Sequence, residues 1–147
     1  EKELADIIYQ FGEERHSRRI ARTIKSLPNL MTVADLKDAV RRSTPPRQRH
    51  KSLARVFQAI RIAVNGELDK LNAFLECFTD YLTIGGRVVI LSYHSLEDRM
   101  VKHTFRALKQ SGILKIITKK PLVPSPEEQA NNSRSRSAKL RVAERIA

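Results

Sequence analysis

The stretch that decides the fold is GGRVVILSYHSLEDR, residues 85–99. Two glycines end the preceding segment, and the apolar run that follows, Val88–Leu91, does not alternate with polar residues. Such a run is typical of a strand that is covered on both faces, as in a parallel sheet flanked by helices. Ser95 is followed three residues later by Asp98, a capping-box spacing, so a helix is expected to open there. The stretch therefore predicts a strand, a turn and a helix of an α/β fold.

Helical periodicity fills the sequence before this stretch. Apolar residues recur at helical spacing in 2–11 and 17–26, and a second capping-box pattern at Thr32 opens a helix through Val40. Residues 43–52 combine two prolines with basic side chains, which predicts a basic linker between two parts of the chain. A long amphipathic pattern over 53–82 then predicts one helix, or two collinear helices with a break at Gly66.

Two more strands are predicted after the helix that follows Ser95. Residues 114–118 are apolar and β-branched, whereas residues 139–146 alternate, with Leu140 and Val142 on one face and Lys139 and Arg141 on the other. These elements make up half of a doubly wound sheet. Further strands are therefore expected to be missing or to come from another chain. A first residue other than Met also favours a piece of a longer protein.

The charge of the chain predicts a polyanionic partner. Its 147 residues carry 28 Lys and Arg against 16 Asp and Glu, a formal net charge of +12. Three segments are basic and poor in acids, namely 15–30, 41–61 and 134–145. A positive run is usually a solvated surface, but three in one small chain exceed what solubility needs. Nucleic acid is the first candidate partner and an acidic membrane surface the second, although no apolar run is long enough to cross a bilayer.

The candidate for chemistry is the turn over residues 93–99, because ligands of open α/β sheets bind where a strand leads into a helix. The turn combines the ring of Tyr93, the imidazole of His94, the hydroxyl of Ser95, two carboxylates and the guanidinium of Arg99. The alternative is structural: these groups cap the helix, pair with one another or pack. No Gly-rich cofactor loop follows a strand, and one cysteine with scattered histidines predicts no metal site.

The motifs resemble, in order and over nearly the whole chain, those of the RsmH (MraW) family. The family consists of methyltransferases that use S-adenosylmethionine and modify the exocyclic N(4) amine of a cytidine in small-subunit ribosomal RNA. The similarity is strongest at 85–99, and the other matching segments are 3–9, 12–15, 17–21, 57–65, 67–68, 101–102, 121–125 and 134–141.

The resemblance implies a Rossmann-like class I methyltransferase sheet, of which this chain holds the carboxy-terminal half, with its last strand antiparallel to its neighbours. Residues 1–50 would be part of a mostly helical inserted domain for substrate recognition, and 51–147 the half sheet. The family's cofactor loop and ribose-binding acid would lie upstream of Glu1, so no residue here is assigned to S-adenosylmethionine and the isolated chain is expected to be inactive.

The resemblance also leads to hypotheses about single residues. His94 and Ser95 would orient the cytosine, Tyr93 would stack on it or form a wall, and Glu97 or Asp98 would position Arg99. The residues expected to contact RNA are Arg47, Arg49, Lys51, Arg61, Arg99, Arg134, Arg136 and Lys139.

The expected partner is small-subunit rRNA or the 30S-type subunit in the cytoplasm, with no membrane, and a homodimer is left open. Two other interpretations stay open at this point. The chain could be a non-enzymatic basic rRNA-binding module, or it could pair with a separate amino-terminal polypeptide.

Overall fold

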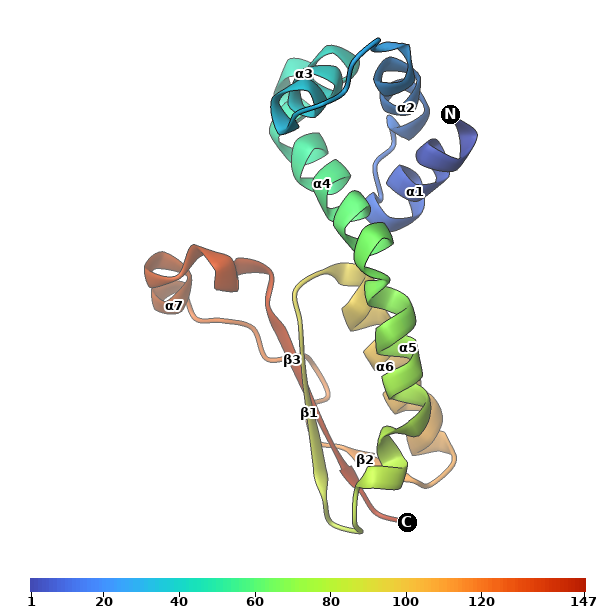
Figure 1. Ribbon diagram of the computed structural model, residues 1–147. Helices are drawn as coiled ribbons and strands as arrows, with labels where there is room; N and C mark the ends of the chain where they lie inside the picture. Colours follow the sequence, from blue (N-terminus) through green and yellow to red (C-terminus); the bar gives the residue numbers. More distant parts are fainter. The chain divides into compact units, whose positions relative to one another are not determined.

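A computed structural model describes all of residues 1–147, with α-helices, short 3-10 helices and one small sheet (Figure 1). The chain divides into two units, Glu1–Glu67 and Leu68–Ala147, each with its own core. No helix combines the length and the apolar character needed to span a bilayer.

The first unit is entirely helical. Its elements are α1 (Lys2–Gly12), α2 (Ser17–Ser26), α3 (Val33–Ser43), the 3-10 helix η1 (Pro46–Gln48) and α4 (Arg49–Asn65). The helices form because each presents a stripe of apolar residues, and these stripes meet in a core around Ile8, Ile20, Val40 and Val56. The predicted capping box of α3 is confirmed, since the Asp35 amide donates to Thr32 Oγ1 at 3.2 Å and the Thr32 amide donates to Asp35 Oδ2 at 2.8 Å.

Helices α1 and α4 approach each other closely at Gly12. A Cβ atom at this position would lie 2.6 Å from the backbone oxygen of Arg55, so residue 12 has no room for a larger side chain. The buried Glu14 carboxylate accepts from the His16 amide at 2.9 Å and lies 3.6 Å from the Arg55 guanidinium. Packing therefore ties α4 to the helices that precede it.

The basic linker expected over 43–52 is not a linker in the structure. Ser43 ends α3, η1 follows at once, and α4 begins at Arg49. Both prolines are compatible with this arrangement. Pro45 precedes η1 and Pro46 is its first residue, where a helix makes no use of the backbone amide that proline lacks. Because α4 packs against the other helices of the first unit, the boundary between the two units falls after Glu67. The sequence had placed the domain boundary after residue 50.

The second unit is a small α/β sandwich. Its elements are α5 (Glu67–Cys77, whose first residue belongs to the first unit), η2 (Phe78–Tyr81), β1 (Arg87–Ser92), α6 (Ser95–Gln110), β2 (Leu114–Ile116), α7 (Pro126–Asn131), η3 (Ser133–Ser137) and β3 (Lys139–Arg145). The break predicted between α4 and α5 is confirmed, with Gly66 in the left-handed conformation at φ 59°.

The sheet has the strand order β1-β3-β2, and β3 runs antiparallel to both neighbours. This confirms the antiparallel last strand and the α/β class that the sequence predicts. Helices α5 and α6 cover one face of the sheet, where Val88, Val101, Phe105 and Ala143 share a core (Figure 1).

The opposite face of the sheet is open in this chain. Val89 is 58% exposed and Leu91 48% exposed, and β1 bonds only to β3. The expectation of a parallel strand covered on both faces is thus not met within residues 1–147, because β1 here has one antiparallel neighbour and one layer of helices. The apolar run of β1 supplies Val88 to the core, while its alternate residues face outward.

Candidate functional site

The turn between β1 and α6 is built by His94, which is the N-cap of the helix. Its backbone is extended, with φ −143° and ψ 165°, and its Nδ1 accepts from the Glu97 amide at 3.3 Å. The sequence had assigned this capping role to Ser95, and that prediction is wrong: Ser95 is the first residue of α6. The imidazole nitrogen takes the acceptor position that a Ser or Asp oxygen fills in most helices.

Glu97 completes the cap from the other direction. Its carboxylate accepts from the Tyr93 amide at 2.9 Å and lies 3.4 Å from His94 Nε2. Since Nδ1 acts as an acceptor, the network places the imidazole proton on Nε2, facing this carboxylate. The His94 ring is therefore held in one orientation by its cap, and it is only 7% exposed.

Asp98 joins the turn to the last strand. It is 7% exposed, and its two carboxylate oxygens accept from Arg141 at 2.7 and 3.2 Å, while Lys139 Nζ lies 3.3 Å away. Burial alone would raise the pKa of Asp98, but the hydrogen bonds and charge of Arg141, with those of Lys139, outweigh it and the pKa is lowered. Asp98 is thus an ionised anchor between α6 and β3.

The three residues predicted to position a base lie together in this turn, with different exposure. The Tyr93 ring is 50% exposed and Ser95 is exposed, whereas His94 is buried beneath them. The arrangement can offer a planar surface and a hydroxyl to a ligand, over an imidazole that cannot rotate without breaking the cap.

No cradle for a nucleotide-like cofactor is present at this turn. The amides of Tyr93 and Glu97, which could bind an anion at the start of α6, already donate to Glu97 and His94. The turn contains no glycine that would let a cofactor approach the backbone. This turn therefore does not by itself fit S-adenosylmethionine.

The residues predicted to contact RNA are spread over several elements. Arg47, Arg49, Lys51 and Arg61 lie on η1 and α4 of the first unit, Arg134 and Arg136 on η3, Arg99 on α6 and Lys139 on β3. All are exposed except Lys139, which is half-buried beside Asp98. The Arg61 guanidinium also donates to Glu67 at 2.8 and 3.1 Å, so the carboxylate offsets part of its charge.

Two features of the second unit were missed from the sequence. Arg141 was placed on the polar face of its strand, yet that face packs against α6 and buries the guanidinium on Asp98. A basic groove along α6 was also missed, although Lys102, Arg106 and Lys109 recur at the spacing of one helical face, a signal that could have revealed it.

Comparison with known proteins places the chain in a family. The sequence model described as the MraW methylase family matches residues 1–146. A protein of Kosmotoga olearia named ribosomal RNA small subunit methyltransferase H is 55% identical over 99% of this chain and 50% of its own length. Proteins of the same name from Nostoc punctiforme and Acaryochloris marina are 52% and 53% identical, each over 99% of this chain and 49% of their own length.

The chain spans about half the length of the curated relatives that it matches. The match nonetheless includes both units and the turn at the start of α6. The chain therefore belongs to the MraW methylase family.

Proposed function

We propose that this chain is the carboxy-terminal part of an enzyme that methylates the exocyclic N(4) amine of a cytidine in small-subunit, 16S-type rRNA. The observation that carries the proposal is the family match over residues 1–146, together with relatives named small-subunit rRNA methyltransferases. We assign the helical first unit, which includes residues 1–50, to an inserted domain for substrate recognition and the second unit, Leu68–Ala147, to the half sheet. The proposed place of action is the cytoplasm, on rRNA or the 30S-type subunit.

The turn between β1 and α6 supplies what the target base needs from the protein. A cytosine amine is a poor nucleophile, since its lone pair is delocalised into the ring, and catalysis depends on holding it in the right orientation. The half-exposed Tyr93 ring can lie against the flipped base, and Ser95 can bond its polar edge. His94 is proposed to act in two ways: its Nδ1 caps α6 and keeps this surface in place, and its imidazole helps to orient the base.

S-adenosylmethionine would supply the methyl group, held mainly by residues outside this chain. Titration calorimetry is expected to show cofactor binding to the full-length protein and not to residues 1–147 alone. Incubation of the full-length protein with S-adenosylmethionine and unmethylated small-subunit rRNA is expected to yield N(4)-methylcytidine, detected by nucleoside mass spectrometry. A full-length protein that binds the cofactor but leaves every cytidine unmodified would refute the proposed reaction.

A second function is favoured by the exposed basic residues of α4. Arg49, Lys51 and their neighbour Arg47 carry no acidic partner within 4.0 Å, a surface that suits a non-enzymatic rRNA-binding module. Absence of cofactor binding from the full-length protein, with RNA binding retained, would support this function. Isolation of a stable complex with a separate amino-terminal polypeptide would instead support a two-chain enzyme.

Reversing the charge of the α4 basic residues is expected to weaken RNA binding. In the triple variant Arg47→Glu/Arg49→Glu/Lys51→Glu, the plot of log affinity against log salt should flatten by about 2, since each phosphate contact on single strands contributes about 0.7. Fluorescence anisotropy with a short labelled RNA at several KCl concentrations measures this slope. The variant Lys2→Glu/Lys37→Glu/Lys70→Glu changes net charge equally at other exposed sites. Equal slopes in both variants would remove these residues from the interface.

A further inference from the structure

We propose that the basic groove along α6, defined by Lys102, Arg106, Lys109, Lys119 and Lys120, binds phosphodiester groups of the RNA substrate. The proposal rests on the function proposed above and adds a contact surface to it that is separate from the β1–α6 turn. None of these five residues was among those that the sequence assigned to RNA.

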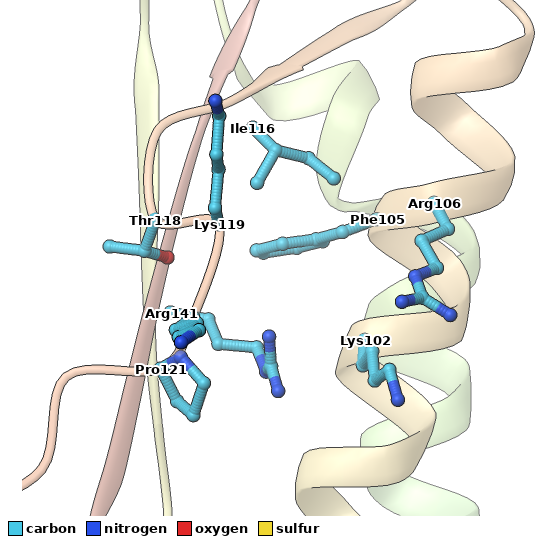
Figure 2. A pocket seen from close by; sticks show the side chains of 9 residues that line it. Lys102, Phe105, Arg106, Ile116, Thr118, Lys119, Pro121 and Arg141 are labelled. Atoms are coloured by element: carbon cyan, nitrogen blue, oxygen red, sulfur yellow. The ribbon is translucent and has the colours of Figure 1, made fainter.

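The groove is a hollow between α6 and the segment that follows β2. Its inner part has a volume of about 250 Å³ and is lined by Lys102, Arg106, Lys119 and Lys120, with Phe105, Ile116, Thr118, Pro121 and Arg141 completing the wall. An adjoining hollow of about 490 Å³ shares Arg106 and Lys119 and adds Lys109. Figure 2 shows the Phe105 ring reaching from α6 across the space toward Ile116, with Lys102 and Arg106 on the same helix.

The charge of the groove is not neutralised by the protein. No Asp or Glu lines either hollow, and none of the five basic side chains is among the cations that lie within 4.0 Å of a carboxylate. Arg141 is different, because Asp98 holds it through two hydrogen bonds. The groove thus concentrates several uncompensated positive charges around a cavity, and such a site attracts an anion.

The segment that carries Lys119 and Lys120 is fixed at both ends. Before it, the amides of Ile117 and Thr118 donate to the Val142 oxygen at 3.0 and 3.2 Å, and Thr118 Oγ1 accepts from the Val142 amide at 2.9 Å. After it, Leu122 and Leu140 exchange two backbone hydrogen bonds of 2.9 Å. The two lysines are therefore presented from a short bridge anchored on β3, opposite the basic face of α6.

The chemistry of the wall favours a nucleic-acid backbone. Phe105 is only 2% exposed, so no aromatic ring is available for a base to stack on. Cations predominate among the polar side chains of the wall, with Thr118 and Gln110 as the neutral ones. Four of the five basic residues are exposed, and the three on α6, Lys102, Arg106 and Lys109, follow one another along the helix. An extended chain of phosphates can meet such a row one after another, with no dependence on base sequence.

The test compares two quadruple variants of equal net charge. Lys102→Gln/Arg106→Gln/Lys119→Gln/Lys120→Gln removes the groove charges, and Lys2→Gln/Lys37→Gln/Lys70→Gln/Lys115→Gln removes four exposed lysines elsewhere. Circular dichroism melting of both checks that the fold is kept. Anisotropy with a short fluorescein-labelled single-stranded RNA then gives the affinity and its salt dependence for each 147-residue chain.

The groove variant is expected to bind RNA about tenfold more weakly than the control variant at moderate salt, with a log-log salt slope flatter by about 3. Equal affinities of the two variants would overturn the proposal. Displacement of the RNA by inorganic phosphate, beyond the effect of KCl at equal ionic strength, would overturn it in favour of a small anion. Failure of the unmodified chain to bind any RNA would overturn it as well. The proposed methylation is tested separately, by whether the full-length protein produces N(4)-methylcytidine.

Discussion

Asp98→Asn is expected to lower the free energy of unfolding of the second unit by about 3–5 kcal/mol, the usual effect of removing one partner of a buried ion pair. The Arg141 guanidinium, with a side chain that is 10% exposed, would remain buried without its carboxylate, in the wall of a groove lined by other cations. Lys139 would lose the same partner. Urea denaturation followed by circular dichroism measures the loss.

The control is an ion pair with the same chemistry on the surface. Asp38 lies 3.5 Å from Arg41, with both side chains more than half exposed, and Asp38→Asn is expected to change stability by no more than about 0.5 kcal/mol. A loss at Asp98 as small as at Asp38 would show that the buried pair contributes little. The double variant Asp98→Asn/Arg141→Met, which removes both charges, should recover part of the stability.

The lowered pKa of Asp98 gives the same pair a pH signature. Since the carboxylate is favoured in the folded state, its contribution is complete above the pKa of the unfolded chain, about 3.9, and is lost as the pH falls through the lower folded pKa. The unfolding free energy of the unmodified chain should therefore fall at acid pH more steeply than that of Asp98→Asn. Parallel curves for the two proteins would contradict the assignment.

His94→Asn is expected to reduce kcat for rRNA methylation by about 100-fold in the full-length protein, the typical range for a lost positioning or proton-handling group. Asn is a good N-cap residue, so this variant keeps the start of α6 while it removes the imidazole. The loss should therefore appear in the rate and not in the melting temperature. Steady-state methyl transfer and thermal melting, run side by side, measure the two effects.

Two further variants separate the roles of His94. His94→Ala removes the cap as well, and it should add a loss of about 1 kcal/mol in stability to the loss in rate. His103→Asn changes an exposed histidine of the same helix and should alter neither. Unchanged turnover in His94→Asn would remove His94 from the reaction and leave it as a helix cap only.

Local signals in the sequence predicted much of the fold. The helices of the first unit follow from apolar residues at helical spacing, and the break at Gly66 follows from a residue that readily adopts positive φ. The alternation of apolar and charged residues in 139–146 predicted a strand with one apolar and one charged face, and β3 forms there. Each of these features depends on neighbours along the chain, which a sequence shows directly.

Two features were not predicted correctly: the inward face of β3 was missed, since it depends on a contact distant in sequence, and the cap of α6 was assigned one residue too late. Whether the charged or the apolar face of β3 turns inward is decided by Asp98, which precedes Arg141 by more than forty residues and offers a partner for its charge. The cap at His94 was assigned to Ser95 because hydroxyls are the commoner caps, and the difference of one residue is set by where β1 ends. The roles of the turn residues in catalysis stay predictions until the variants are measured.

The central place of β3 in the sheet has a consequence for how this unit folds. β1 and β2 do not pair with each other, so the hydrogen bonds among these three strands all wait for β3, which leaves the ribosome last of the three. Until β3 is present, Asp98 on α6 lacks its partners Lys139 and Arg141. The apolar side of β1 then has only helices to pack against. Pairing of these three strands is therefore a late, non-local step, and such steps are slow and expose strand edges to wrong partners in the meantime.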